Sequence, residues 1–209
     1  MIKKFLKFFA PEIALNYYRN KTNKIRFKEW EENGCLLPAP HLIKQLTIKE
    51  YKKKYKYELL VETGTYTGEM VEAQRKIFKK IYSIELSTEL YEAALERFSK
   101  ENNIVIINGD SGKVLSELIS QIDEPAIFWL DGHYSGGITA RGEKECPIFE
   151  ELDAIFCYQK FNHILLIDDA RCFTGKGDYP TIELLEKYVK SKNHNYKLQV
   201  KHDIIRFVV

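Results

Sequence analysis

Acidic side chains stand at or just after the ends of five apolar runs in this chain of 209 residues. They are Glu62, Glu85, Asp110, Asp131 and the adjacent pair Asp168 and Asp169. One such residue is often only a turn former, but five in succession are harder to explain in that way. Carboxylates that meet in one crevice can accept hydrogen bonds from hydroxyl groups or hold a hard cation. The spacing therefore predicts a ligand-binding crevice lined by carboxylates.

A short glycine-rich segment follows the first of these runs, with Gly64 and Gly68 as its two glycines. Such a turn lets the backbone approach a ligand closely. The dinucleotide fingerprint G-x-G-x-x-G would need a glycine where this chain has Tyr66, which disfavours a nicotinamide or flavin enzyme, and no P-loop lysine follows. Glu85 lies about 20 residues beyond the turn, where a carboxylate can accept hydrogen bonds from both ribose hydroxyls.

Strand-like and helix-like segments alternate from Tyr57 to the C-terminus. Apolar runs predict strands at 58–62, 81–85, 103–108, 126–131 and 163–169, and amphipathic periodicity predicts helices at 69–80, 88–98, 111–122, 147–158 and 181–192. Residues 196–209 predict two further strands in a hairpin around His202 and Asp203. This order specifies a doubly wound α/β protein with a mostly parallel sheet, in which ligands bind at the carboxyl ends of the strands.

The overall composition is that of a globular protein, with 44% hydrophobic and 30% charged residues, and it argues against a largely disordered chain. No apolar run approaches the roughly 20 residues that a membrane span needs. The four cysteines form no C-x-x-C pair, and the start of the chain offers no clear cleavage site for a secretory signal. We therefore expect reduced structural thiols and a cytoplasmic location.

The charge is unevenly distributed along the chain. Residues 1–60 hold 14 Lys or Arg against 6 Asp or Glu, whereas residues 61–209 hold 18 against 24. Basic segments attract anionic partners such as lipids, nucleic acid or phosphorylated substrates. We expect residues 1–56 to form a basic N-terminal helical extension of a domain at 57–209, rather than a domain of their own.

Two parts of this extension have alternative interpretations. Residues 1–10 carry apolar side chains at helical spacing, which suits a peripheral membrane contact, packing on the body, or contact with a second subunit in a homodimer; packing is favoured. The run from Tyr51 to Tyr57 mixes basic and aromatic residues, as in single-strand binders. We favour a solvated helix end that leads into the first strand.

Five segments, VETGTYTG, IYSIELS, NGDS, FWLDGHY and LLIDDA, occur in this order across residues 57–209. In order and spacing they resemble the motifs of class I S-adenosylmethionine-dependent methyltransferases. The resemblance implies a seven-stranded sheet whose last strand is antiparallel, with S-adenosylmethionine as the cofactor. The cofactor-binding residues it implies are Glu62, Thr63, Gly64, Thr65 and Gly68 around the methionine part, Glu85 at the ribose, Asp110 and Ser111 near the adenine, and Asp131.

The stretch from Asp131 to Tyr134 bears on the acceptor of the methyl group. Methyltransferases that act on amino groups of bases usually carry [DN]-P-P-[YF] here, so nucleic acid is disfavoured. Asp131, Asp168 and Asp169 could instead hold Mg²⁺ and lower the pKa of an acceptor hydroxyl. This arrangement is similar to the catechol-type and macrocin-type O-methyltransferases, and it makes Asp131 and His133 the candidate catalytic residues, with His133 as the general base.

The metal and the base both have structural alternatives. His133 could simply hydrogen-bond a loop, Asp168 could cap a turn, and Asp169 could pair with Arg171 or Arg141. Two loops, at 135–147 and 170–180, are expected to shape the acceptor site. They carry Arg141, Lys144, Arg171 and Lys176, which would suit an anionic small-molecule or glycan acceptor, although solvated loop charge is a strong alternative.

The segment DGHYSGG-x-TARG-x-K-x-x-PI-x-EEL also resembles uncharacterised bacterial methyltransferases associated with surface-polysaccharide gene clusters. This makes O-methylation of a sugar hydroxyl the leading hypothesis. An RNA methyltransferase, which the basic front would favour, and a non-catalytic scaffold that binds the cofactor are the alternatives.

Overall fold

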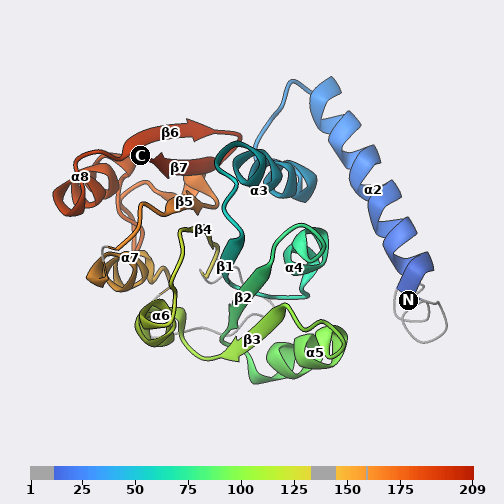
Figure 1. The fold of residues 1–209 in the computed structure, drawn as a ribbon. Coiled ribbons are helices and arrows are strands. Elements are labelled where there is room, and N and C mark those ends of the chain that lie inside the picture. Colours follow the sequence, from blue (N-terminus) through green and yellow to red (C-terminus); the bar gives the residue numbers. More distant parts are fainter. Residues whose placement is uncertain (1–11, 133–144, 159) are drawn as a thin grey trace.

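The centre of the molecule is a seven-stranded sheet with the strand order β3-β2-β1-β4-β5-β7-β6 (Figure 1). The computed structural model describes residues 12–132, 145–158 and 160–209. Strands β1 to β5 pair in parallel, whereas β7 is antiparallel to both of its neighbours. The doubly wound α/β fold and the antiparallel last strand are both confirmed.

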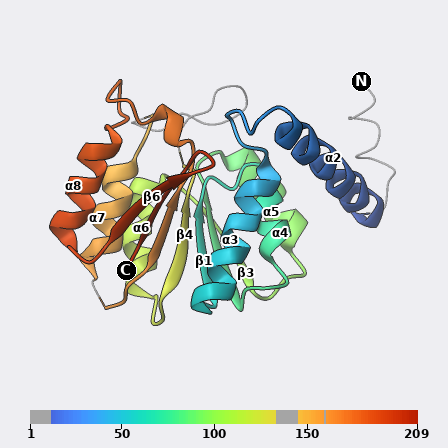
Figure 2. The same cartoon turned by 90° about the horizontal axis from the view of Figure 1, so that it is seen from above.

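Helices cover both faces of this sheet (Figures 1 and 2). Helices α6, α7 and α8 pack over one face, and α3, α4 and α5 pack over the other. The strands are β1 Leu59–Thr63, β2 Lys80–Glu85, β3 Ile104–Asn108, β4 Ala126–Leu130, β5 Ile164–Ile167, β6 Lys197–Lys201 and β7 Ile204–Val208. The helices are α2 Glu12–Glu32, α3 His41–Tyr55, α4 Glu69–Gln74, α5 Thr88–Phe98, α6 Ser111–Ser120, α7 Ile148–Cys157 and α8 Ile182–Lys192.

The central strands are buried on both faces, as strands in a helix-covered parallel sheet must be. All five residues of β1 and of β4 are buried. Along β1, Leu59 and Val61 face the core under α6 and α7, whereas Leu60 faces the core under α3 and α4. This alternation follows from the two-residue period of a strand.

The helix after the glycine turn is shorter than the sequence predicts. Periodicity favours a helix from residue 69 to 80, but α4 ends at Gln74. The amide of Asn103 donates to the carbonyl oxygens of Arg75 and Phe78 at 2.8 and 3.0 Å, and Phe78 is buried in the core. The chain leaves the helix early because this turn places Phe78 under the sheet and starts β2 at Lys80.

The terminal hairpin and the lysine-rich run follow the sequence-based expectations. His202 and Asp203 both adopt positive φ in the two-residue turn between β6 and β7, as a type I′ hairpin requires. The run from Tyr51 to Tyr57 is the end of α3, with Lys53 and Lys54 exposed and Lys56 in the left-handed C-cap conformation.

Helix α3 packs in the hydrophobic core that lies between the sheet and helices α3, α4 and α5. Its Ile48 is fully buried, and Tyr51 packs in the same core as Leu60. The predicted domain boundary at residue 57 falls in the short connection between α3 and β1. Helix α2 contacts α3, and its Trp30 ring packs edge-on against His202 in the β6–β7 turn, while most of the helix lies beside the domain (Figure 1). In the described part of the chain, no helix has the length and apolar character that a membrane span requires.

Candidate active site

The glycine turn after β1 comes into close contact with the end of β4. Gly64 has a φ of +84°, and its amide donates to the carbonyl of Ile84 at 2.9 Å. A Cβ atom at Gly64 would lie only 2.4 Å from the carbonyl oxygen of Asp131. The amide of Asp131 in turn donates to the side chain of Thr63 at 3.2 Å. The turn and the end of β4 therefore pack tightly against each other, and only a glycine at position 64 permits this close approach.

Glu62 is a buried carboxyl group directly beneath this turn. Its side chain is only 2% exposed, and the Ser83 hydroxyl donates to its Oε2 at 2.5 Å. Thr65 Oγ1 lies 2.6 Å from the same hydroxyl, which links the turn to β2. Burial raises the pKa of Glu62 to about 8, and the nearby charge of Glu85 acts in the same direction, while the Ser83 hydrogen bond opposes it. Glu62 is therefore mostly protonated at neutral pH.

This protonation makes the stability of the ligand-free protein depend on pH. The native carboxyl binds its proton more tightly than the unfolded one, so its stabilising effect is complete below about pH 4.5 and is lost as pH rises through about 8. We expect Glu62→Gln to reduce the loss of unfolding free energy between about pH 5 and pH 9 by a few kcal/mol. The pKa of the nearby Asp131 is also raised, so some pH dependence should remain. Urea unfolding at several pH values measures the free energy of unfolding. If it falls with pH as steeply in Glu62→Gln as in the unsubstituted chain, the prediction is wrong.

Glu85 holds the glycine turn from the neighbouring strand. Its Oε2 accepts from the amide of Tyr66 at 2.7 Å, and its Oε1 accepts from the amide of Ser87 at 2.9 Å. A carboxylate oxygen accepts more than one hydrogen bond, so these contacts leave room for hydroxyl donors. The predicted ribose-binding residue thus lies at the end of β2, beside the turn, and Gly68 ends that turn with a φ of +73°.

Asp110 and Ser111 start α6 next to the same edge of the sheet. Asp110 is the N-cap of that helix and accepts from the amide of Gly112 at 3.0 Å. The buried Ser111 hydroxyl donates to Oε1 of Glu151 at 2.6 Å. Glu151, from α7, is only 2% exposed, and no local sequence pattern predicts it at this edge. A Cβ at Gly132 would meet Glu151, Ser111 and Thr63 at 2.8 to 3.1 Å, so these side chains surround that glycine.

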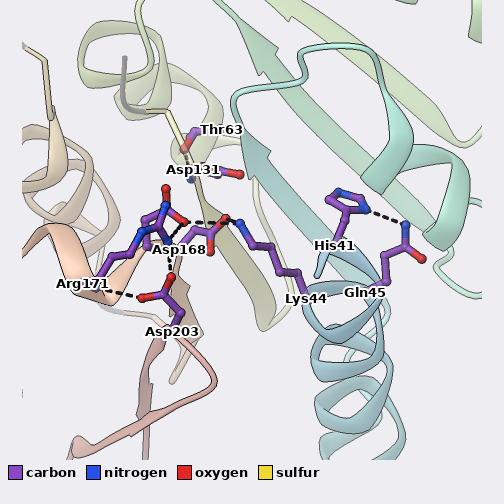
Figure 3. Close-up of polar contacts among 9 residues, drawn as sticks. His41, Lys44, Gln45, Thr63, Asp131, Asp168, Arg171 and Asp203 are labelled. Atoms are coloured by element: carbon purple, nitrogen blue, oxygen red, sulfur yellow. Dashed lines mark hydrogen bonds and ion pairs between the residues drawn. The ribbon is translucent and has the colours of Figure 1, made fainter. Parts of the chain in front are cut away.

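Asp131, Asp168 and Asp169 come together at the ends of β4 and β5. Figure 3 shows the side chains of Asp131 and Asp168. Burial raises the pKa of Asp131 to about 7, and the charges of Asp169 and Glu62 add to this, while Lys44 and a hydrogen bond with Asp168 oppose it. The Asp168 side chain is fully buried. Burial and the charge of Asp131 raise the pKa of Asp168 as well, although the charge of Lys44 opposes this.

Lys44 is the residue of this cluster that the sequence reasoning missed. Its Nζ donates to Oδ2 of Asp168 in a short ion pair (Figure 3) and lies 3.4 Å from Oδ1 of Asp169. Although burial lowers the pKa of Lys44, the charges of Asp168, Asp131 and Asp169 outweigh it and raise the pKa above its ordinary value. Lys44 is therefore a permanent cation in a cluster of three carboxyl groups.

Arg171 provides a second cation at the outer side of the cluster. Its guanidinium donates to Oδ1 of Asp169 at 2.7 Å and also pairs with the buried carboxylate of Asp203 (Figure 3). The backbone amide of Arg171 donates to Asp203 at 2.8 Å. This is the pairing of Asp169 with Arg171 that the sequence offered as the alternative to a metal ligand. Lys176, on the same 170–180 loop, is exposed.

The magnesium prediction is not confirmed. Within residues 12–132, 145–158 and 160–209, no three His, Cys, Asp or Glu side chains form a group that could hold a metal ion. Asp168 and Asp169 already share Lys44, and Asp169 also contacts Arg171. A hard divalent cation needs several oxygen ligands that are not committed to another cation, so this donor set does not fit Mg²⁺ well.

His133, Arg141 and Lys144 lie outside the described residues, so the general-base prediction for His133 stays a prediction. The described histidine near the cluster is His41, one turn before Lys44 on α3. Its Nδ1 lies 2.8 Å from the amide nitrogen of Gln45 (Figure 3). Burial lowers the pKa of His41, against an opposing influence from Glu69.

Comparisons with known proteins find the same fold in solved structures. No protein-family model and no curated protein matches the sequence. The O-methyltransferase TomG from Streptomyces achromogenes, solved with S-adenosylmethionine, is 11% identical with a TM-score of 0.55, over 99% of this chain and 94% of that one. The S-adenosylhomocysteine-bound Podospora anserina methyltransferase PaMTH1 is 16% identical, with a TM-score of 0.53 over 96% of each chain.

A third solved structure is MycE, a methyltransferase of mycinamycin biosynthesis in complex with Mg, S-adenosylhomocysteine and mycinamycin VI. It is 14% identical with a TM-score of 0.54, and the match covers 77% of this chain and 48% of MycE. At these identities the likeness concerns the fold. The chain has the Rossmann-like fold of the class I S-adenosylmethionine-dependent methyltransferases.

Proposed function

We propose that the chain transfers a methyl group from S-adenosylmethionine to a hydroxyl group of a small-molecule acceptor, with a sugar or glycan precursor as the preferred acceptor class. The observation that carries the proposal is the surface formed by the Gly64 turn, Glu62, Glu85 and Asp131 at the carboxyl ends of β1, β2 and β4. Ligands of doubly wound sheets bind at this edge. Three solved structures with the same fold, named above, contain this cofactor or its product, which supports the proposal.

The residues of the site fit this cofactor for physical reasons. Gly64 packs against the Asp131 carbonyl with no space for a side chain, so the backbone of the turn can lie directly under a ligand. Glu85 is anchored by the amides of Tyr66 and Ser87, which holds its carboxylate ready to accept ribose hydroxyls. When bound, S-adenosylmethionine supplies an electrophilic methyl group on a sulfonium.

The Asp131, Asp168 and Lys44 cluster gives this edge a means to handle the proton of an acceptor hydroxyl. Asp131, with a pKa raised to about 7, changes protonation near neutral pH, which suits a group that accepts a proton during transfer. Lys44 beside it stabilises negative charge on the carboxylates. His133 remains the other candidate base. For the acceptor, the proposal rests on the resemblance of the 131–152 segment to polysaccharide-cluster methyltransferases.

The test is methyl transfer from labelled S-adenosylmethionine to a panel of neutral and acidic sugars, sugar nucleotides and a structured RNA. The expected result is label in a hydroxyl-bearing sugar acceptor and release of S-adenosylhomocysteine. The matched control is Asp131→Asn, which should reduce turnover by about 100-fold or more, because it removes the group that accepts the proton. Label incorporated only into RNA would replace the glycan proposal with the alternative that the basic front first suggested.

A further inference from the structure

Helix α3 brings a lysine to the edge of the sheet where the carboxylates meet. The helix ends at Tyr55 and β1 begins at Leu59, so the chain reverses within a few residues at the amino ends of the strands. The first turn of α3 therefore lies at the opposite, carboxyl edge, as Figure 2 shows for the helix alongside β1. His41 and Lys44 occupy that first turn. A segment that the sequence marks as an extension thus supplies a side chain to the site.

Lys44 is held among these carboxylates by packing as well as by charge. The neighbouring Ile43 and Gln45 are both buried, and the backbone carbonyl of Gln45 accepts from the side-chain amide of Gln74 on α4 at 3.1 Å. One turn further along, the Thr47 hydroxyl accepts from the buried guanidinium of Arg206 on β7 at 3.4 Å. These contacts fix α3 relative to both neighbours, so the position of the lysine is set by the fold. Its side chain remains 15% exposed.

We propose that the Lys44 ammonium takes the place that a divalent cation would occupy between Asp131, Asp168 and Asp169, and that the chain has a lysine-based, metal-independent acceptor site. This inference deepens the proposed function, because it concerns the same edge of the sheet. Lys44 is a positioning residue: it neutralises and orients Asp168, which is fully buried and hydrogen-bonds Asp131.

The contacts of the cluster support a lysine in preference to a metal ion. An ammonium group offers three donors and needs no exact coordination geometry, and here it contacts Asp168 and Asp169 from two successive positions of the chain. Asp169 is further held by Arg171, and the Asp169 amide donates to Oδ1 of Asp168 at 2.8 Å. A divalent ion would have to displace these donors and lie beside a like charge, which costs free energy.

The experiment measures Mn²⁺ binding, by the loss of the free-ion signal in electron paramagnetic resonance, to the full chain and its variants. Lys44→Gln removes the ammonium but keeps a side chain of similar reach. We expect no stoichiometric binding to the unsubstituted chain at low millimolar Mn²⁺, and binding with a Kd of about 1 mM or tighter in Lys44→Gln, a gain of at least about tenfold. Adding Asp168→Asn to that variant should remove the gained binding.

Lys53→Gln is the matched control, because Lys53 is an exposed lysine on the same helix. Like the unsubstituted chain, it should show no stoichiometric Mn²⁺ binding. Two results would overturn the inference: stoichiometric Mn²⁺ binding to the unsubstituted chain that Asp168→Asn abolishes, or no gain in a folded Lys44→Gln variant. The first of these results does not depend on whether a Lys44 variant folds. A parallel titration with S-adenosylhomocysteine tests the proposed function separately, because that binding does not depend on Mn²⁺ in the inferred site.

Discussion

Gly64→Ala should weaken the binding of S-adenosylhomocysteine by at least about 100-fold, which corresponds to about 2.7 kcal/mol. A Cβ atom at this position would lie 2.4 Å from the Asp131 carbonyl oxygen, which is a backbone atom, and the position of a Cβ is itself fixed by its backbone, so neither can rotate away. The φ of +84° adds about 1 to 2 kcal/mol of strain for any L side chain. The turn must therefore move, and with it the amide of Tyr66 that Glu85 holds. Isothermal titration calorimetry measures the change.

Gly34→Ala is the matched control for this variant. Gly34 also has a positive φ, of +75°, but a Cβ there would meet nothing within 4 Å. It lies between α2 and α3, so this variant should lose some stability and keep its affinity for the ligand. Unchanged affinity in a folded Gly64→Ala protein would mean that the cofactor does not bind over this turn.

Asp168→Ala should lower the free energy of unfolding by about 3 to 5 kcal/mol at neutral pH, because it leaves the Lys44 ammonium with its main counter-charge removed in a largely buried position. Urea unfolding of the two proteins measures the difference. The cause is tested by a second substitution. Lys44→Met in the Asp168→Ala background removes the uncompensated charge and should recover at least half of the lost stability.

The control for Asp168 is an ion pair at the surface. Lys28 and Glu32 lie 3.6 Å apart on α2, with both side chains more than 60% exposed. Glu32→Ala should change the stability by less than about 1 kcal/mol, since exposed pairs contribute little. A similarly small loss for Asp168→Ala would contradict the view that Asp168 and Lys44 form a tightly coupled buried pair.

The parallel strands were predictable because their burial on both faces leaves a plain sequence pattern. Runs such as residues 126–130 are continuously apolar, and each is followed by a polar residue at the sheet edge. The order of the strands then determines which of these polar residues meet, so the approach of Glu62, Glu85 and Asp131 to the glycine turn followed from the sequence. The helix after that turn was predicted too long, because apolar residues at helical spacing continue beyond its end. In the structure the helix ends at Gln74, and Phe78 packs in the core instead.

The cations of the site could not be predicted in the same way. Lys44 is one of many lysines in a basic segment, and nothing local distinguishes it from the exposed Lys53. Its role depends on α3 folding back along β1, which brings residue 44 to residue 168. A usable signal was present in the short connection between α3 and β1, since it places the first turn of the helix at the active edge. Glu151 was missed for the same reason: its partner Ser111 is distant in sequence.

The most direct test of the central claim is a calorimetric titration of the cofactor-free protein with S-adenosylhomocysteine, in buffer with a chelator and again with Mg²⁺. We expect binding with a Kd near the micromolar range, about −8 kcal/mol, with the same affinity in both buffers. Gly64→Ala should lose this binding, whereas Gly34→Ala should keep it. No binding in either buffer would contradict the methyltransferase assignment, and the carboxylate-lined edge would then belong to another ligand.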